Sequence, residues 1–343
     1  MFTSATIENF RGIERLSVEG LGRVNLIIGK NNSGKTALME ALCALGAEGG
    51  AAEVLSFTQA LRMPHGREGD LEGFWRPFFR GGELERGFTV QAKRTDGTEI
   101  RLSMHQLLGS HAVSHSAGGR RSGNWTLAYD VQTQGKVERF ELSKRSDEII
   151  YPASGKTGLV WLGTGPPTLE GLISELSNLK LQGRDGEVRD LLRWLDERID
   201  GLEILSPTGE RASVFFRVSG EPIMLPMEAM GEGVQRCLEV GTLVATEGVS
   251  FVAVDEIENG LHHSALKSVW NWLAEVSASR GIQIVATTHS EECVQAACQA
   301  FTELGDNGLK VIRLDRREHE TVAQVYDRDL VAAAERMDIE IRG

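Results

Sequence analysis

A glycine-rich run that ends in lysine and threonine is the clearest chemical feature of this sequence. Its residues fit the spacing GxxxxGK[ST] and are Gly29, Lys30, Asn31, Asn32, Ser33, Gly34, Lys35 and Thr36. In such a loop the backbone N–H groups wrap a polyphosphate, and the start of the next helix faces its negative charge. Lys35 is predicted to bridge the β- and γ-phosphates, and the Thr36 hydroxyl to bind Mg²⁺. The nucleotide contacts predicted around this loop are Gly29, Asn31, Asn32, Ser33, Gly34, Lys35, Thr36 and Ala37.

Two acidic residues follow the apolar run at residues 251–254, which places them at the carboxyl end of a buried strand. Asp255 is predicted to hold Mg²⁺ through water. Glu256 is predicted to polarise the attacking water, since the general base must lie beside the metal rather than on it. A second apolar run ends in His289, which is placed to reach the γ-phosphate or that water. A solvated acidic loop and a structural histidine are the ordinary alternatives, and the phosphate loop favours the catalytic interpretation.

A second glycine-led helix start occurs at residues 230–236, with the sequence MGEGVQR. The first N–H groups of a helix have no partner inside the helix and can meet an anion. We therefore predict nucleotide contacts from Gly231, Gly233 and Gln235, with a simple helix-entry turn as the alternative. Because the chain already holds one phosphate loop, this second helix start indicates a site that another copy of the protein completes.

The elements that must position these residues alternate between buried strands and helices. Strands are predicted at residues 5–9 and 24–28, with a buried helix at 37–45 after the glycine-rich run. Further strands are predicted at residues 88–94, 99–104, 125–129, 137–142, 202–205 and 213–218. Helices are predicted at residues 188–199, 234–244 and 265–276, and buried strands at 251–254, 282–286 and 310–314. This alternation predicts an α/β fold with a largely parallel sheet covered by helices.

Length and composition limit the classes of protein that remain. A chain of 343 residues favours two lobes or one enlarged α/β domain. The formal charge of −12 is opposite to that of a protein gripping nucleic acid over a wide surface, so any DNA contact must be local. The four cysteines lie in apolar patterns without a CxxC pair and are predicted to be buried thiols. No apolar run is long enough for a membrane span and the first residues lack a signal-peptide pattern, so we expect a cytoplasmic protein.

The order of these motifs resembles that of a known group. Asn9-Phe10-Arg11, GKNNSGKT, MGEGVQR, VDEIENGLHH and ATTHS are similar to motifs of the ATP-binding-cassette ATPases of the SMC, RecF and OLD type, particularly the small bacterial RecF/OLD-like ATPases of defence loci. The resemblance spans residues 1 to about 301. It implies a P-loop NTPase of the ABC ATPase head type, with ATP and Mg²⁺ as cofactors.

The resemblance also implies how the chain is divided. Residues 1–343 would form a single head. Its parts would be a Walker A region at 1–52, an antiparallel β-rich insertion at 53–165, a helical lobe with the signature motif at 166–236, and a Walker B and switch-histidine lobe at 237–343.

In that group ATP lies head-to-tail between two copies, which implies a homodimer formed through an ATP sandwich. By resemblance, residues 231–236 form the signature helix, 259–263 line the dimer seam, His289 is the switch histidine and Arg11 contacts the nucleotide.

The sequence departs from the group's patterns at several points. Gly231 stands where many relatives have serine, and His262-His263 where transporter ATPases have aspartate, so a transporter-like subunit is disfavoured. A glutamine for the lobe-coupling loop is not evident, and residues 161–165 are left as an unassigned equivalent. Only 53 residues follow Ser290, so we expect no Toprim nuclease of the OLD type in this chain, and no long coiled coil.

Three functions remain at this point. The first is an ATP-hydrolysing, dimerising switch that controls a partner effector, a nuclease or toxin, in antiphage defence, with the β-rich insertion presenting the surface that the partner recognises. The second is a RecF-like ATPase that clamps duplex DNA or DNA ends, for which the candidate basic residues are Arg76, Arg80, Arg86, Arg120 and Arg121. The third is a non-catalytic ATP-binding module, which Glu256 disfavours. The sequence lacks an NKxD motif for guanine, so ATP is preferred over GTP.

Overall fold

The computed structural model describes residues 1–107, 124–145, 148–153, 158–163, 169–207, 209, 211–317, 320–328 and 330. Arg120, Arg121 and Gly165, which entered the sequence-based hypotheses, lie outside these residues. Of the helices in the described part of the chain, none combines the length and the apolar character that crossing a lipid bilayer requires.

A six-stranded sheet forms the centre of the molecule and confirms the predicted parallel arrangement. Its strands, in order, are β16 (Glu320–Asp327), β15 (Leu309–Arg317), β3 (Val24–Ile28), β14 (Gln283–Thr287), β13 (Phe251–Val254) and β9 (Leu159–Leu162). All neighbours pair in parallel except β15 and β16, which form an antiparallel hairpin. Every residue of β3, β13 and β14 is buried, as expected of parallel strands covered on both faces.

A seven-stranded antiparallel sheet forms a second layer. Its strands, in order, are β2 (Ile13–Glu19), β1 (Phe2–Phe10), β4 (Phe88–Arg94), β5 (Glu99–Gln106), β6 (Trp125–Thr133), β7 (Lys136–Arg145) and β8 (Glu148–Ile150). Because β1 pairs directly with β4, the N-terminal strands and the later strands form one continuous sheet. The fold class predicted from the sequence is thereby confirmed, including its antiparallel part.

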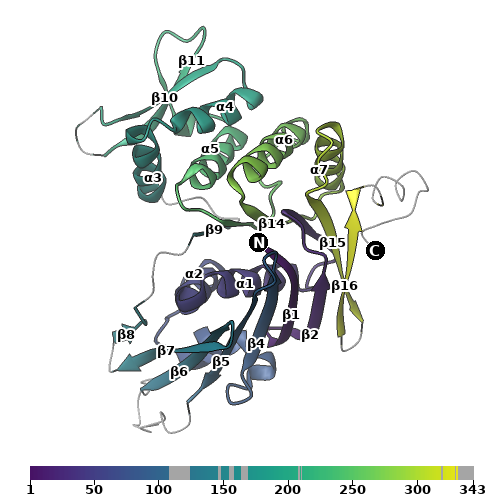
Figure 1. Ribbon diagram of the computed structural model, residues 1–343. Coiled ribbons are helices and arrows are strands. Elements are labelled where there is room, and N and C mark those ends of the chain that lie inside the picture. Colours follow the sequence, from purple (N-terminus) through teal and green to yellow (C-terminus); the bar gives the residue numbers. More distant parts are fainter. Residues whose placement is uncertain are drawn as a thin grey trace.

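The structure has helices on both sides of the parallel sheet and two more that pack against other helices. They are α1 (Lys35–Gly46), α2 (Ala51–Arg62), α3 (Leu169–Leu181), α4 (Asp185–Leu195), α5 (Glu232–Ala245), α6 (His263–Arg280) and α7 (Glu291–Glu303). The additional two, α3 and α4, pack against α5 and α6. Figure 1 shows α5, α6 and α7 side by side on one face, with α1 and α2 between the other face and the antiparallel sheet. Short helical turns occur at η1 (Glu48–Gly50), η2 (Leu71–Trp75), η3 (Arg76–Phe78), η4 (Arg80–Gly82) and η5 (Met227–Ala229).

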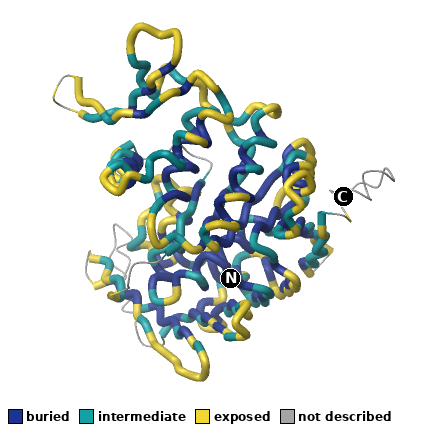
Figure 2. The backbone as a smooth tube through the Cα atoms, turned by 45° about the horizontal axis from the view of Figure 1, so that its top comes forward, coloured by how far each residue is buried: buried dark blue, intermediate teal, exposed yellow. Residues whose placement is uncertain are grey.

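Two hydrophobic cores match these layers. One joins α1 to the antiparallel sheet, and the other joins the parallel sheet to α3 through α7. Figure 2 shows buried backbone running through the middle of the molecule and exposed backbone at its outer loops. The sheets are also linked by Gln283, a buried residue of β14. Its side-chain amide accepts a bond from the Phe2 N–H and donates to the carbonyls of Phe2 and Gly22.

The segment between α3 and α5 contains strands as well as helices. A three-stranded antiparallel sheet is formed by β10 (Ile199–Leu205), β11 (Ser213–Val218) and β12 (Leu225–Pro226). The helix predicted over residues 188–199 was wrong at its end. It stops at Leu195, and Ile199 begins β10 with its side chain buried against the same core. Apolar spacing alone does not distinguish the last turn of a helix from the start of a buried strand.

Candidate nucleotide site

The loop from Gly29 to Thr36 connects β3 to α1 and adopts backbone angles that glycine favours. Gly29 has φ 142° and Gly34 has φ 101°, a region that residues with a Cβ rarely adopt. A Cβ on Gly29 would lie 2.5 Å from the Leu314 carbonyl oxygen. The two glycines therefore let the chain turn sharply from a buried strand into a helix whose N-terminus has no side-chain cap.

The groups on this loop fit a phosphate. The Lys35 ammonium donates to the carbonyls of Gly29 at 2.8 Å and Lys30 at 3.1 Å, which holds it across the loop. The buried Ser33 hydroxyl has no hydrogen-bond partner among the described residues. An unpaired buried hydroxyl is costly, and an anion seated in the loop would supply the missing acceptor.

The acidic pair lies at the end of β13, as predicted, and a threonine from β14 organises it. Thr287 Oγ1 donates to Asp255 Oδ1 at 2.6 Å and accepts from the Glu256 N–H at 2.8 Å. Thr36 Oγ1 lies 3.5 Å from the same Asp255 oxygen. One hydroxyl and one carboxylate from opposite sides of the pocket thus face each other, a donor set that suits Mg²⁺. Among the described residues no group of three or more His, Cys, Asp or Glu side chains forms a metal site, so a cation here would rely on this pair, water and phosphate oxygens.

Glu256 and His289 also lie together. Glu256 Oε1 is 3.8 Å from His289 Nε2, and Glu256 Oε2 accepts a bond from the Asn259 amide at 3.1 Å. Glu256 has φ 48°, a strained conformation for a residue other than glycine. The His289 N–H donates to Glu258 at 2.7 Å, so the loop after β13 fixes the loop after β14.

These groups share one pocket of about 330 Å³. The predicted residues that line it are Arg11, Asn31, Asn32, Ser33, Gly34, Lys35, Thr36, Ala37, Asp255, Glu256 and His289. Gly29 is not among the lining residues. It contributes indirectly, because its carbonyl accepts a bond from Lys35 and its backbone forms the turn at the start of the loop. Residues that the sequence analysis missed are Gly12, Ile13, Arg62, Arg316 and Thr321. Arg62 ends α2, whereas Arg316 and Thr321 lie on the β15–β16 hairpin, and neither element carries a recognisable motif.

Arg11 is held by a buried acid. Its Nε and Nη2 atoms donate to the two Glu40 oxygens at 2.6 and 2.8 Å, and Nη2 also donates to Gln59 at 3.0 Å. The guanidinium carbon lies 4.2 Å from the centre of the Phe78 ring. Burial lowers the pKa of Arg11, and Glu40 opposes that shift. The predicted strand-end arginine is therefore fixed at the wall of the pocket.

The second predicted anion site does not join this pocket. Gly231 is the exposed residue before α5, and a Cβ there would meet nothing within 4 Å. Gly233 lies in the first turn, where a Cβ would be 3.1 Å from the Gly260 carbonyl oxygen. The Gln235 amide donates to the Met230 carbonyl at 2.9 Å. The start of α5 thus packs against the loop after Glu256 and leaves Gly231 exposed.

The described arginines proposed for DNA are engaged with acids. Arg76 pairs with Glu72 and Arg80 with Glu14, and Arg86 lies 3.5 Å from Glu83. Arginines neutralised in this way do not form a basic groove. All four cysteines are buried, as predicted.

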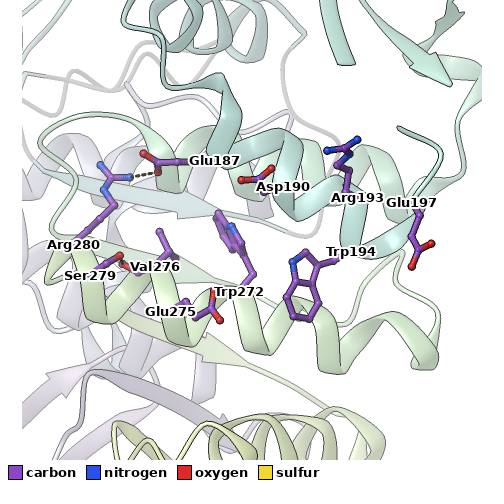
Figure 3. A pocket seen from close by; sticks show the side chains of 10 residues that line it. All are labelled: Glu187, Asp190, Arg193, Trp194, Glu197, Trp272, Glu275, Val276, Ser279 and Arg280. Atoms are coloured by element: carbon purple, nitrogen blue, oxygen red, sulfur yellow. Dashed lines mark hydrogen bonds and ion pairs between the residues drawn. The ribbon is translucent and has the colours of Figure 1, made fainter. Parts of the chain in front are cut away.

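A larger hollow of about 730 Å³ lies apart from the nucleotide pocket, between α4 and α6. Figure 3 shows Trp194 and Trp272 in it, with Asp190 and Glu275 beside them and the ion pair between Glu187 and Arg280 at one end. It shares no lining residue with the nucleotide pocket.

The position of each chemical group follows from the order of the strands. β3, β14 and β13 are neighbours in the parallel sheet, and their carboxyl ends deliver the phosphate loop, the histidine and the acidic pair to the same edge. The fold is thereby an α/β P-loop fold of the ATP-binding-cassette and SMC head type.

Comparison with known proteins supports this class. Residues 1–53 match a family described as "AAA ATPase domain", and residues 128–294 match one described as "AAA domain, putative AbiEii toxin, Type IV TA system". The chain resembles an ATP/GTP phosphatase of Helicobacter pylori, with 18% identity over 88% of this chain and 89% of that protein. A 42-residue stretch is 50% identical to a protein of Methanocaldococcus jannaschii named MJECL10, and it covers 12% of this chain and 19% of that relative.

Solved structures agree in fold. The SMC head domain of Thermotoga maritima aligns over 95% of this chain and 98% of its own, with 14% identity and a TM-score of 0.51. The SMC head of Pyrococcus furiosus, determined with the C-terminal domain of ScpA, aligns over 99% of both chains with 11% identity and a TM-score of 0.55. Residues 1–53 and 128–294 thus match AAA ATPase-domain families, and the chain has the fold of an SMC head.

Proposed function

We propose that this ATPase is a dimerising switch in which ATP joins two copies, and that the joined state controls a partner effector, a nuclease or toxin. One observation carries the proposal. The pocket gathers the phosphate loop, the acidic pair and His289, whereas the exposed start of α5 lies outside it. A glycine-led helix start with no side-chain cap is suited to a phosphate, and because it lies outside this pocket, the proposal is that it meets a phosphate bound to another copy.

The residues of the pocket have distinct parts in the proposed reaction. The loop N–H groups, Lys35 and Ser33 would hold the phosphates. Thr36 and Asp255 would hold Mg²⁺, which neutralises phosphate charge when it is bound. Glu256 would accept the proton of the attacking water, and Asn259 would keep its carboxylate oriented. His289 would hold the γ-phosphate or that water in place.

The effector part of the proposal draws on the matched families. The family that matches residues 128–294 is described as "AAA domain, putative AbiEii toxin, Type IV TA system", and two SMC heads of similar fold were determined with a bound domain of ScpA. A head whose shape changes with nucleotide can favour a partner only through different contacts in its two states. Defence against phage is the setting that a toxin-linked ATPase would serve.

The test of the switch is Glu256→Gln. We expect ATP turnover to fall about 100-fold or more, while ATP-dependent dimers accumulate in size-exclusion chromatography with light scattering. Glu275→Gln, an exposed position on α6, is the matched control and should behave like the wild type. Unchanged turnover in Glu256→Gln would show that Glu256 is not the base.

To test for an effector, the Glu256→Gln protein is purified by affinity from its native host with ATP and Mg²⁺. Mass spectrometry then identifies the proteins that remain bound to it. A nuclease or toxin retained only with ATP would support control of an effector. Chromosomal DNA with repair factors would instead support a DNA clamp and contradict this part of the proposal.

A further inference from the structure

Glu40 is an acid of α1 whose side chain has no exposed surface, and it contacts two arginines from different elements. Arg11 follows β1 and Arg62 ends α2. The Arg11 Nε lies 2.6 Å from one Glu40 oxygen, and the Arg62 Nε lies 3.1 Å from the other. Both arginines line the nucleotide pocket, whereas Glu40 does not.

The charges of this cluster do not balance. In the described part of the chain Glu40 is the one acid within 4.0 Å of either guanidinium, so two positive charges share one negative charge. Four cationic side chains (Arg11, Lys35, Arg62 and Arg316) and two acidic ones (Asp255 and Glu256) line the whole pocket. With Glu40 included, four cations face three acids, so a chain with a net charge of −12 has a small local positive excess at this site, and a positive excess in a pocket favours a bound anion.

The exposed fractions of the three side chains indicate that each has a different role. Glu40 is 0% exposed and Arg11 11% exposed, and Arg11 is also fixed by Gln59 and Phe78. Arg62 is 41% exposed at the rim, and Glu40 is its one ion-pair partner among the described residues. A guanidinium held at its Nε by an acid keeps its outer N–H groups available for phosphate oxygens.

We infer that Arg62 is a second nucleotide-binding arginine that contacts the phosphates, and that Glu40 is a positioning residue that holds Arg11 and Arg62 at the correct spacing. This inference rests on the proposed ATP site and adds the wall of the pocket formed by α2. It also gives α2 a direct link to the nucleotide, because Gln59 and Arg62 both belong to its last turn.

Binding of a fluorescent ATP analogue with Mg²⁺, measured at low and at high salt, tests the inference. For Arg62→Ala we expect the Kd to rise about tenfold at low salt. The rise should be smaller at high salt, because salt already screens the attraction between Arg62 and the phosphates in the wild type. Arg62→Lys keeps the charge and should recover part of the affinity. Arg67→Ala, an exposed position outside the pocket, is the matched control and should bind like the wild type.

Glu40→Gln tests positioning, since both arginines remain while their shared charge is lost. Its Kd should rise, and Glu40→Asp should restore part of the affinity. If Glu40→Gln does not fold, Arg62→Ala still decides the matter, because Arg62 lies at the rim. An Arg62→Ala protein with wild-type affinity and salt dependence would overturn the inference. Failure of the wild type and of Arg67→Ala to bind the analogue would instead overturn the proposed ATP site.

Discussion

Thr287 Oγ1 donates a hydrogen bond to Asp255 Oδ1 at 2.6 Å, and this contact joins the ends of two neighbouring parallel strands. The same oxygen accepts the N–H of Glu256. A single hydroxyl thus holds both acidic residues, the first through its side chain and the second through its backbone. The strained φ of Glu256 is stabilised by this bond.

Thr287→Val should therefore slow catalysis without abolishing nucleotide binding. The variant keeps the volume of the side chain but removes a bond to a carboxylate, worth about 1.5–3 kcal/mol. We expect turnover to fall about tenfold or more and the Mg²⁺ requirement to rise, as measured by steady-state ATPase assays across Mg²⁺ concentrations. Thr302→Val, at an exposed position on α7, should leave both quantities unchanged. Equal Mg²⁺ curves for Thr287→Val and the wild type would argue against this role.

Gly231→Trp should separate binding by one copy from assembly of two. A Cβ at this position meets nothing within 4 Å, so the single copy should fold and bind ATP normally. The indole would cover the start of α5, so ATP-dependent dimers should disappear and turnover should become independent of protein concentration. Light scattering and ATPase assays over a concentration series report the two effects. Gly186→Trp, in the first turn of α4, is the control. Dimers of normal affinity in Gly231→Trp would contradict the composite site.

Gln283→Leu should destabilise the fold rather than the chemistry. It leaves the buried N–H of Phe2 without its partner and takes a donor from the carbonyls of Phe2 and Gly22. Each unsatisfied buried group costs about 1–3 kcal/mol, so we expect a loss of roughly 3 kcal/mol in the free energy of unfolding. Urea denaturation measures the loss. The exposed Gln299→Leu on α7 should cost almost nothing, and a similar midpoint for the two variants would refute the link between the sheets.

The buried cysteines predict a pH dependence. Burial raises the pKa of the Cys237 and Cys293 thiols from the ordinary value of 9.0 to about 12. Their thiolates should therefore not form in the native state near pH 9, and a thiol reagent should react far more slowly with native than with urea-unfolded protein. Only the unfolded chain releases these protons above pH 9, so stability should fall as the pH rises from about 9 toward 12. Reagent kinetics that follow an ordinary thiol pKa in the native protein would contradict this burial.

Local patterns in the sequence were enough for the central parallel strands β3, β13 and β14 and the chemical groups that follow them, whereas the edge strand β9 was not predicted. Short, mainly apolar runs before GKNNSGKT, before Asp255-Glu256 and before His289 predict both the strands and the edge at which they end. The roles assigned to the individual site residues remain predictions, as do the boundaries of the parts.

The missed features depend on contacts between distant segments. Glu40 looks like one more polar residue of an apolar helix, and its partners lie 29 and 22 positions away in the chain. Thr287 looks like ordinary strand sequence, although it orients an acid 32 positions earlier. Arg316 and Thr321 reach the pocket only because the β15–β16 hairpin lies beside β3. No spacing rule within one segment could supply these relations.

The loop after β13 has Glu256 at one end and Gly260, packed against Gly233, at the other. Three residues (257–259) therefore separate Glu256 from Gly260, so in the proposed dimer this loop would link the carboxylate at one nucleotide to the helix start that meets the other. In a symmetric pair each such loop would lie between both ligands. A movement of this loop at one nucleotide would then also move the helix start at the other, so we expect ATP hydrolysis at the two sites to be coupled.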